Sequence, residues 1–255
     1  MDHHCNDRIA VIGAGSWGTA LAMQLARNGV PTQLWGRDPR QMAEMADMRC
    51  NPRYLPDIRF PDGLALTANL AQAVSDSDHL LLVVPSGAFR GTLRQIAPIL
   101  KPDCRIAWAS KGLEPGSRRL LHEIIEEELG RQQPCAVISG PTFASEVARG
   151  LPTAVTVAST NEEVAAYFSA CLHGDTFRVY TGSDVIGVEV GGACKNVLAI
   201  AAGAADGLGF GANTRAALIT RGLAELMRLG VHMGCLLYTS PSPRDRTRSR
   251  MPSSA

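Results

Sequence analysis

Three glycines near the N-terminus have the spacing of a turn that brings a backbone close to phosphate. Gly13, Gly15 and Gly18 form a Gly-x-Gly-x-x-Gly pattern directly after the apolar run Ile9-Ala-Val-Ile. In such a turn the first glycine permits a tight reversal, the second leaves room for a pyrophosphate, and the third lets the following helix approach the strand. The free N–H groups at the start of that helix attract an anion. The pattern therefore predicts a dinucleotide-binding turn.

The surrounding sequence separates this interpretation from an ordinary tight turn. A helix-forming segment, Thr19 to Asn28, follows the third glycine, and a second short strand, Thr32 to Trp35, arrives within the span of one βαβ unit. Ser16 and Trp17 fall at the start of the helix. A hydroxyl there can donate to phosphate, and an indole can cover one side of the cofactor.

The residue type after the second strand indicates which dinucleotide is bound. A carboxylate at this strand end would accept from the ribose 2′-hydroxyl and repel a 2′-phosphate, whereas Arg37 offers a planar cation to that phosphate. Arg37 therefore favours NADP(H). Asp38, one residue later, keeps NAD(H) open, and a solvated Arg37 is the structural alternative.

Polar residues follow further apolar runs and should gather at one edge of a sheet. In a doubly wound sheet, ligands bind at the carboxyl ends of the strands. The residues concerned are Pro85 and Ser86 after His79 to Val84, Lys111 after Arg105 to Ala109, and Gly140 and Thr142 after Cys135 to Ile138. Lys111 would supply positive charge for an anionic substrate. Alternatively, Lys111 is a solvated loop residue and Thr142 is a helix N-cap.

Lys195 is the strongest candidate for proton transfer. Apart from the thiol of Cys194, it is the only ionisable side chain between Val190 and Ala205, in a segment otherwise suited to burial. Desolvation would lower its pKa toward the useful range, and a bound phosphate dianion would raise it again. Asn196 could donate to or accept from a substrate hydroxyl or carbonyl. Alternatively, Lys195 packs its stem and keeps its ammonium in water.

The elements that must position these residues predict an α/β fold. Short apolar strands alternate with helical segments over residues 1–183, which indicates a Rossmann-like, doubly wound, mostly parallel sheet. The strands Thr153 to Ala158 and Phe177 to Tyr180 should complete it. Residues 184–230 consist mainly of helix formers and predict an all-α region. Residues 231–255 are rich in Pro, Ser, Thr and Arg, which predicts a disordered tail.

Composition limits the other classes of function. The chain has 255 residues, 45% of them hydrophobic, and a formal net charge of +1, which argues against a nucleic-acid partner. No apolar run approaches the length of a membrane span, and the N-terminus lacks a signal peptide, so we expect a cytoplasmic protein without stable membrane insertion. The seven cysteines show no Cys-x-x-Cys pair, so we expect reduced thiols and no metal site.

Together, these motifs resemble the bacterial-type NAD(P)-dependent glycerol-3-phosphate dehydrogenase family. The resemblance covers roughly residues 8–230, in the family's order and spacing. It is carried by Gly13-Ala-Gly-Ser-Trp-Gly, Leu34-Trp-Gly-Arg, Val83-Val-Pro-Ser, Ser110-Lys-Gly-Leu-Glu, Ile138-Ser-Gly-Pro-Thr-Phe-Ala, Gly191-Gly-Ala-Cys-Lys-Asn and Asp206-Gly-Leu-Gly-Phe-Gly-Ala-Asn.

The resemblance implies NAD(P)H-dependent interconversion of dihydroxyacetone phosphate and sn-glycerol 3-phosphate for glycerophospholipid synthesis. It implies that Lys195 is the catalytic acid/base. The cofactor contacts that it implies are Ser16, Trp17, Arg37, Lys111 and Ala144. The implied substrate contacts are Lys111, Gly140, Thr142, Lys195 and Asn196.

The resemblance stops after Gly230, where the family would continue with an Asp and a Ser-Arg-Asn trio that bind the substrate. We therefore expect an incomplete helical domain, an apolar face left exposed, and association such as homodimer formation. Two alternatives follow. The chain could be an NADP(H)-binding module without a competent substrate site, or a related β-hydroxyacid or ketopantoate-type reductase.

Overall fold

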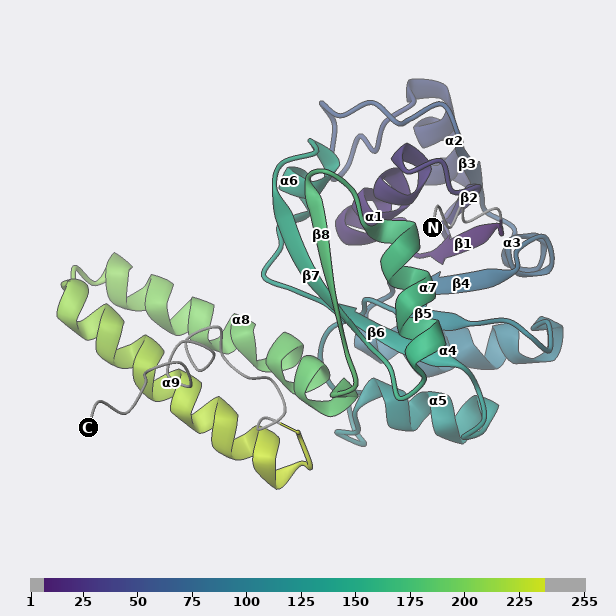
Figure 1. The fold of residues 1–255 in the computed structure, drawn as a ribbon. Coiled ribbons are helices and arrows are strands. Elements are labelled where there is room, and N and C mark those ends of the chain that lie inside the picture. Colours follow the sequence, from purple (N-terminus) through teal and green to yellow (C-terminus); the bar gives the residue numbers. More distant parts are fainter. Residues whose placement is uncertain (1–6, 237–255) are drawn as a thin grey trace, which may run out of the picture.

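A computed structural model describes residues 7–236 as a sheet covered by helices, followed by a hairpin of two long helices (Figure 1). The strands are β1 (Ile9–Ile12), β2 (Thr32–Trp35), β3 (Leu64–Thr67), β4 (His79–Leu82), β5 (Ile106–Trp108), β6 (Cys135–Ser139), β7 (Thr153–Ala158) and β8 (Phe177–Gly182). The α-helices are α1 (Ser16–Arg27), α2 (Pro39–Met48), α3 (Leu70–Ser75), α4 (Ser86–Ile96), α5 (Leu121–Leu129), α6 (Ala144–Ala148), α7 (Glu162–Leu172), α8 (Val185–Gly207) and α9 (Ala212–His232). A short 3₁₀ helix, η1 (Ala97–Ile99), follows α4.

Within the described residues, the strands form one sheet in the order β3-β2-β1-β4-β5-β6-β7-β8. Neighbouring strands are parallel except β6 and β7. The strand order reverses at β1, which lies between β2 and β4, and dinucleotides bind at such a switch point. The predicted Rossmann-like, mostly parallel fold is therefore confirmed, and it places the glycine turn at the switch point.

The two faces of the sheet explain the apolar sequences of the central strands. Successive strand residues point to opposite faces, so a strand covered on both sides is apolar throughout. Ile9 and Val11 join the core beneath α1 and α7, whereas Ala10 and Ile12 join the core beneath α4 and α5. All four residues are fully buried. This double burial fixes the position at which the glycine turn leaves β1.

Several element boundaries differ from the sequence expectation. β3, which the sequence did not predict, pairs with β2, with Leu64 opposite Thr32. Helix α1 begins at Ser16, with Gly15 as its N-cap, so Ser16 and Trp17 lie in its first turn as expected. Helix α9 continues to His232, two residues beyond the expected end of the helical region. Most of the tail predicted to be disordered, residues 237–255, lies outside the described residues.

Cysteine chemistry also differs from the expectation of reduced thiols throughout. Cys171, buried near the end of α7, is disulfide-bonded, so the expectation is wrong for this residue. Cys50, Cys104, Cys135 and Cys194 have free thiols. Sequence spacing could not show this because a disulfide depends on which side chains meet in space. Within residues 7–236, no group of three or more His, Cys, Asp or Glu side chains could hold a metal ion.

Helices α8 and α9 pack together and project away from the sheet (Figure 1). Gly222 of α9 lies against Leu198 of α8, and a side chain at Gly222 would clash there. By length and composition α8 could cross a membrane, so the expectation that no apolar segment reaches that length is wrong. The apolar character over this length becomes apparent only when the helix is known to continue through its glycines.

Candidate functional site

The glycine turn is fixed by close backbone contacts. Gly13 has a φ of 126°, and a Cβ there would clash with the carbonyl oxygen of Val83. A Cβ at Gly18 would clash with the carbonyl oxygen of Gly13. Around the Cβ position of Gly15, by contrast, there is open space. The first and third glycines therefore allow the fold to close, and the second leaves its backbone accessible to a phosphate.

A cleft of about 370 Å³ opens beside this turn, along the carboxyl ends of β1, β4, β5 and β6. It brings together the segments Gly15 to Gly18, Val83 to Pro85, Ala109 to Lys111 and Thr142 to Ala144. These segments include eight of the residues proposed from the sequence: Gly15, Ser16, Trp17, Gly18, Pro85, Lys111, Thr142 and Ala144. The fold thus gathers at one edge motifs that are more than a hundred residues apart.

Two polar atoms in this cleft suit a bound ligand. Trp17 Nε1 and Thr142 Oγ1 are buried and have no hydrogen-bond partner among the described residues. Thr142 is not a helix N-cap, because α6 begins at Ala144 and its N-cap is Phe143. A buried polar group without a partner is costly. A polar cofactor or substrate could satisfy both atoms, so the residues present fit a dinucleotide.

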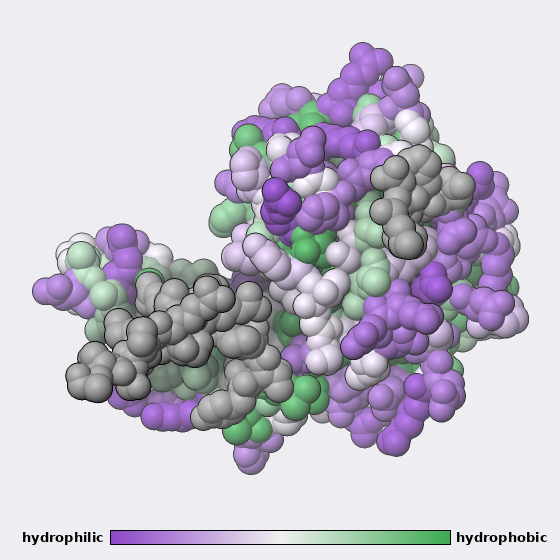
Figure 2. Space-filling view, viewed as in Figure 1, coloured by the Kyte–Doolittle hydropathy of each residue, from purple (hydrophilic) through white to green (hydrophobic). Residues whose placement is uncertain are grey.

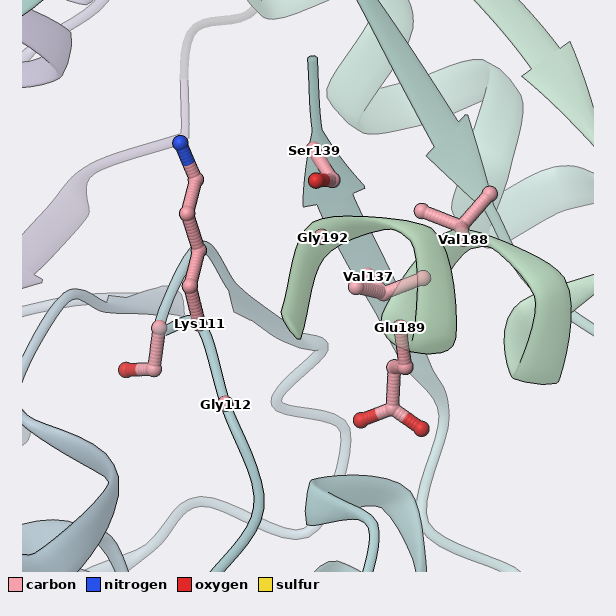
Figure 3. A pocket seen from close by; sticks show the side chains of 8 residues that line it. Lys111, Gly112, Val137, Ser139, Val188, Glu189 and Gly192 are labelled. Atoms are coloured by element: carbon pink, nitrogen blue, oxygen red, sulfur yellow. The ribbon is translucent and has the colours of Figure 1, made fainter. Parts of the chain in front are cut away.

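Two lysines from distant parts of the sequence lie close together. Lys111 lines the cleft, and Lys195, which is not among the lining residues, interacts with it. Lys195 Nζ donates to the carbonyl oxygen of Gly140, and Lys111 Nζ lies 5.0 Å from the ring centroid of Trp17. Burial, together with the neighbouring charge of Lys195, lowers the pKa of Lys111 to about 8. Figure 3, a close view of a smaller pocket that Lys111 also borders, shows this side chain extended with its Nζ away from Glu189. Two adjacent ammonium groups make this part of the cleft suitable for an anion.

Arg37 and Asp38 have different environments at the end of β2. Asp38 Oδ1 accepts from the backbone N–H of Arg40 at 2.9 Å and caps α2. Its carboxylate is thus engaged in the helix cap, whereas Arg37 is exposed to solvent outside the cleft. This arrangement leaves the Arg37 guanidinium accessible to a phosphate on the adenosine end of a dinucleotide.

The remaining candidates, Gly13, Gly140 and Asn196, do not line the cleft. Gly140 contributes its carbonyl oxygen to Lys195, and a side chain there would clash with the backbone of Ala154 and Val155. Gly13 lies behind the cleft, as its contact with Val83 shows. Asn196 is exposed on α8 and is not among the residues that line the cleft.

Sequence reasoning missed Glu189, which lies beside the lysine cluster. A small pocket borders Lys111, Ser139, Glu189 and Gly192 (Figure 3). Glu189 is buried in α8 and accepts from Trp108 Nε1 at 3.1 Å and from His122 Nδ1 at 2.5 Å. A lone carboxylate in the apolar run Val185 to Val190 is the same signal that identified Lys195, and it could have identified Glu189.

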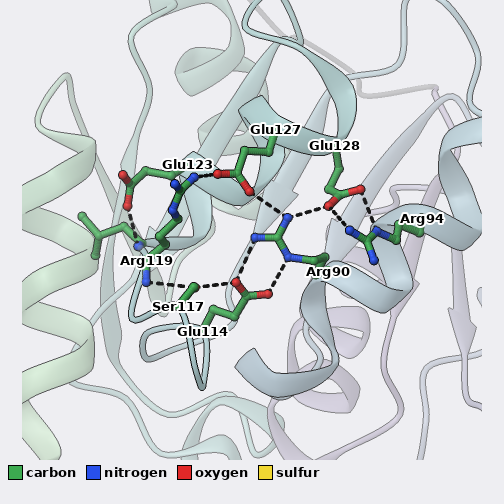
Figure 4. Close-up of polar contacts among 9 residues, drawn as sticks. Arg90, Arg94, Glu114, Ser117, Arg119, Glu123, Glu127 and Glu128 are labelled. Carbon is green, nitrogen blue, oxygen red and sulfur yellow. Dashed lines mark hydrogen bonds and ion pairs between the residues drawn. The ribbon is translucent and has the colours of Figure 1, made fainter.

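An ionic network supports the loop that carries Lys111 (Figure 4). Arg90 of α4 binds both carboxylate oxygens of Glu114, at 2.7 and 2.9 Å, and Glu128 of α5 at 2.5 Å. Hydrogen bonds from Arg90 and then Ser117 lower the pKa of Glu114 to about 2. The loop between β5 and α5 is therefore bound to two helices, although Lys111 itself lies outside the network.

Comparison with known proteins gives a consistent result. Family models described as the N-terminus and C-terminus of NAD-dependent glycerol-3-phosphate dehydrogenase match residues 8–165 and 184–241. A glycerol-3-phosphate dehydrogenase [NAD(P)+] of Aeromonas hydrophila is 60% identical over 227 residues, which are 89% of this chain and 68% of the relative. The corresponding protein of Thioalkalivibrio sulfidiphilus is 62% identical over 223 residues, 87% of this chain and 67% of the relative.

A solved structure is similar over nearly the whole chain. The crystal structure of glycerol-3-phosphate dehydrogenase from Coxiella burnetii superposes with a TM-score of 0.86 at 45% sequence identity. The match covers 95% of this chain and 78% of that one. Both the sheet and the helical hairpin therefore have counterparts in that structure.

Proposed function

This chain belongs to the NAD-dependent glycerol-3-phosphate dehydrogenase family, and we propose from this premise how its residues carry out the reaction. The reaction is the reversible, NAD(P)H-dependent reduction of dihydroxyacetone phosphate to sn-glycerol 3-phosphate. The observation that carries the proposal is the close approach of Lys195 to Lys111, which lines the dinucleotide cleft. This family match disfavours a ketopantoate-type reductase.

The nucleotide end of the cleft has the features needed to hold the cofactor. The backbone at Gly15 and Ser16, at the start of α1, provides N–H donors and a positive helix end for the pyrophosphate. Trp17 and Ala144 border the cleft, and Pro85 limits it at the end of β4. When bound there, the nicotinamide of NAD(P)H supplies the hydride.

The lysines serve the substrate. Lys111 attracts the anionic phosphate compound, and the Thr142 hydroxyl provides a buried polar contact. Lys195 Nζ, oriented by the Gly140 carbonyl, stabilises negative charge on the keto oxygen and gives it a proton. Asn196 would reach the substrate from the next position of α8. In the reverse direction Lys195 takes the proton back.

Removal of the Lys195 ammonium tests this assignment. Lys195→Ala should reduce NADPH oxidation with dihydroxyacetone phosphate by at least about 10³-fold, because the charge on the reacting oxygen loses its stabilising group. The dissociation constant for NADPH, measured by fluorescence titration, should change less than about twofold. Lys101→Ala is the matched control, since Lys101 pairs with Asp78 at the opposite edge of the sheet. Undiminished turnover in Lys195→Ala would refute the assigned role.

The same two assays on the unsubstituted chain distinguish an active enzyme from a module that only binds the cofactor. Turnover of dihydroxyacetone phosphate supports the enzyme. Saturable NADPH binding without turnover at any substrate concentration supports a binding module without a competent substrate site.

We further propose that NADP(H) is preferred over NAD(H), because Arg37 is accessible while Asp38 caps α2. Arg37→Asp should weaken NADPH binding by about 10- to 100-fold and leave NADH binding within about threefold, since only NADPH carries the 2′-phosphate. Titration of both dinucleotides into this variant measures the difference, and Arg40→Asp controls for loss of a neighbouring charge. Equal weakening of both cofactors would contradict the role of Arg37.

Four broader proposals accompany the reaction. We place the domain boundary at Ser183, just before the Asp184 cap of α8, and assign residues 1–183 to the cofactor domain and the two helices from Val185 to His232 to a helical domain. We propose a cytoplasmic protein that does not bind nucleic acid, consistent with its net charge of +1. Membrane insertion of α8 would require separating Glu189 from His122, which is costly. The exposed face of the helical hairpin supports a homodimer.

A further inference from the structure

The helix that carries Lys195 is joined to the sheet through a buried carboxylate. Glu189 is 7% exposed, and its side chain is surrounded by residues of other elements. Oε1 accepts from Trp108 Nε1 and from the backbone N–H of His122, both at 3.1 Å. Oε2 contacts His122 Nδ1 at 2.5 Å. Three hydrogen bonds therefore connect α8 with β5 and α5 at one point.

This point lies close to both lysines along the chain. Trp108 is fully buried at the end of β5, three residues before Lys111. Gly192, three residues after Glu189, packs so closely on Ser139 that a side chain would clash with its hydroxyl. Ser139 directly precedes Gly140, whose carbonyl accepts from Lys195. Helix α8 therefore contacts both the strand that leads to Lys111 and the residue that precedes Gly140, the acceptor of Lys195.

The position of the hairpin increases the importance of this attachment. Helices α8 and α9 project away from the sheet, and α8 contacts the sheet mainly through β6 and β7 (Figure 1). Val197 and Ile200, beyond Lys195, are 67% and 72% exposed. The part of α8 beyond Lys195 is therefore not packed on the sheet domain and does little to fix the position of Lys195.

We propose that Glu189 is a positioning residue that sets the separation of Lys111 and Lys195 by fixing α8 against β5 and α5. The proposal rests on the assignment of these lysines to the substrate site. Glu189 itself touches neither ammonium: in Figure 3 its carboxylate points away from the Lys111 side of the pocket. Its effect on the lysines comes from holding α8 against β5 and α5.

The charges around this attachment are consistent with an ion pair. Burial opposes protonation of His122, but the hydrogen bond and charge of Glu189 outweigh it and raise the pKa of His122. Glu123 and Glu126 on the same helix contribute in the same direction. From β6, burial and then the charge of Glu189 raise the pKa of the Cys135 thiol to about 11, so this thiol stays neutral.

The test uses Lys111 as a reporter of its distance from Lys195. Competitive labelling of amines with acetic anhydride over pH 6 to 11, read by peptide mass spectrometry, gives the pH at which Lys111 loses its proton. In the unsubstituted chain this pH should be about 8. In Glu189→Ala, α8 moves away and water enters, so the midpoint should rise by about one pH unit or more.

Three further variants complete the test. Glu189→Gln keeps an oxygen acceptor for Trp108 and should rescue more than half of the shift. Glu225→Ala is the matched control, because Glu225 is an exposed carboxylate of the same hairpin that pairs with Arg228 on α9. It should leave the Lys111 midpoint unchanged. If Glu189→Ala does not fold by circular dichroism, Trp108→Phe removes a single donor and should produce a smaller rise.

A folded Glu189→Ala, or Trp108→Phe in its place, with an unchanged Lys111 midpoint would overturn the proposal, as would an equal shift in Glu225→Ala. Labelling needs no turnover, so failure of this inference differs from failure of the proposed enzyme. If the chain reduces dihydroxyacetone phosphate, kcat should fall at least about tenfold in Glu189→Ala while the NADPH dissociation constant stays within about twofold.

Discussion

At the scale of single residues, the site depends on two neighbouring lysines, of which one contacts a backbone carbonyl and the other an aromatic ring. Lys195 donates to the Gly140 oxygen, whereas Lys111 lies near the Trp17 ring and has its pKa lowered to about 8, chiefly by burial. A lysine that titrates near physiological pH provides charge only on the acid side of that value. Substrate attraction should therefore depend on pH through Lys111.

This dependence predicts the behaviour of KM. Between pH 7 and 9 the charged fraction of Lys111 falls about tenfold, so KM for dihydroxyacetone phosphate should rise by up to about tenfold. Initial rates at several pH values measure this. Lys111→Arg is the control, because a guanidinium stays charged and its KM should stay nearly constant. The same rise in Lys111→Arg would show that another group titrates.

The same lysine contributes to stability with a defined sign. Its pKa in the folded protein, about 8, lies below the ordinary value of 10.5. Between these values the unfolded chain binds more protons than the folded chain. The contribution of Lys111 to the free energy of unfolding therefore becomes more favourable as pH rises from about 8 toward 10.5.

At the scale of elements, the middle of the loop between β5 and α5 is held by ion pairs. Arg90 of α4 contacts Glu114 of the loop and Glu127 and Glu128 of α5, and these three carboxylates would repel one another without it (Figure 4). The Arg90 and Ser117 hydrogen bonds lower the pKa of Glu114 to about 2, below its ordinary 4.5. The stabilisation is therefore present above pH 4.5 and is lost as pH falls toward 2.

Arg90→Met tests the importance of this network, since it keeps the aliphatic volume and removes the charge. Tm at pH 7 should fall by about 2–5 °C, and the loss of Tm between pH 5 and 3 should be smaller than in the unsubstituted chain. Thermal melts followed by circular dichroism measure both. Arg131→Met, at a side chain 86% exposed, should shift Tm by less than about 1 °C. Equal shifts in the two variants would contradict a special role for Arg90.

At the scale of the whole molecule, the helical hairpin differs from the rest of the surface. Val197, Ile200, Leu223 and Met227 are each more than half exposed. Figure 2 shows hydrophobic residues among hydrophilic ones on the visible part of the hairpin. Exposed apolar residues gathered on two neighbouring helices favour association.

Self-association should therefore depend on the hairpin. Sedimentation velocity should show a mass that rises with concentration, and the double variant Ile200→Lys, Met227→Lys should shift the protein toward the monomer, because charges on the face resist burial. Leu151→Lys, at an exposed leucine of the sheet domain, should have no effect. An unchanged mass in the double variant would place the contact elsewhere.

The sequence by itself determined the features that depend on local backbone geometry. Gly13 is required where φ is positive, and Gly18 where two backbones nearly touch, so their spacing identified the turn. Continuous apolar runs predicted the central strands because both faces of those strands are buried. Lys195 was identified because a charge is unexpected in an apolar helix. These signals need only a few neighbouring residues.

Only the tertiary structure decided which distant residues meet. Glu189 reaches Trp108 across 81 positions, and Lys195 reaches Gly140 across 55. β3 took its place through pairing with β2. The cap of α6 is Phe143, one position after Thr142, so the Thr142 hydroxyl is not used in the cap. The lowered pKa of Lys111 likewise depends on burial and on Lys195. Hydrogen bonding and desolvation act over a few ångströms in space, so sequence spacing does not encode them.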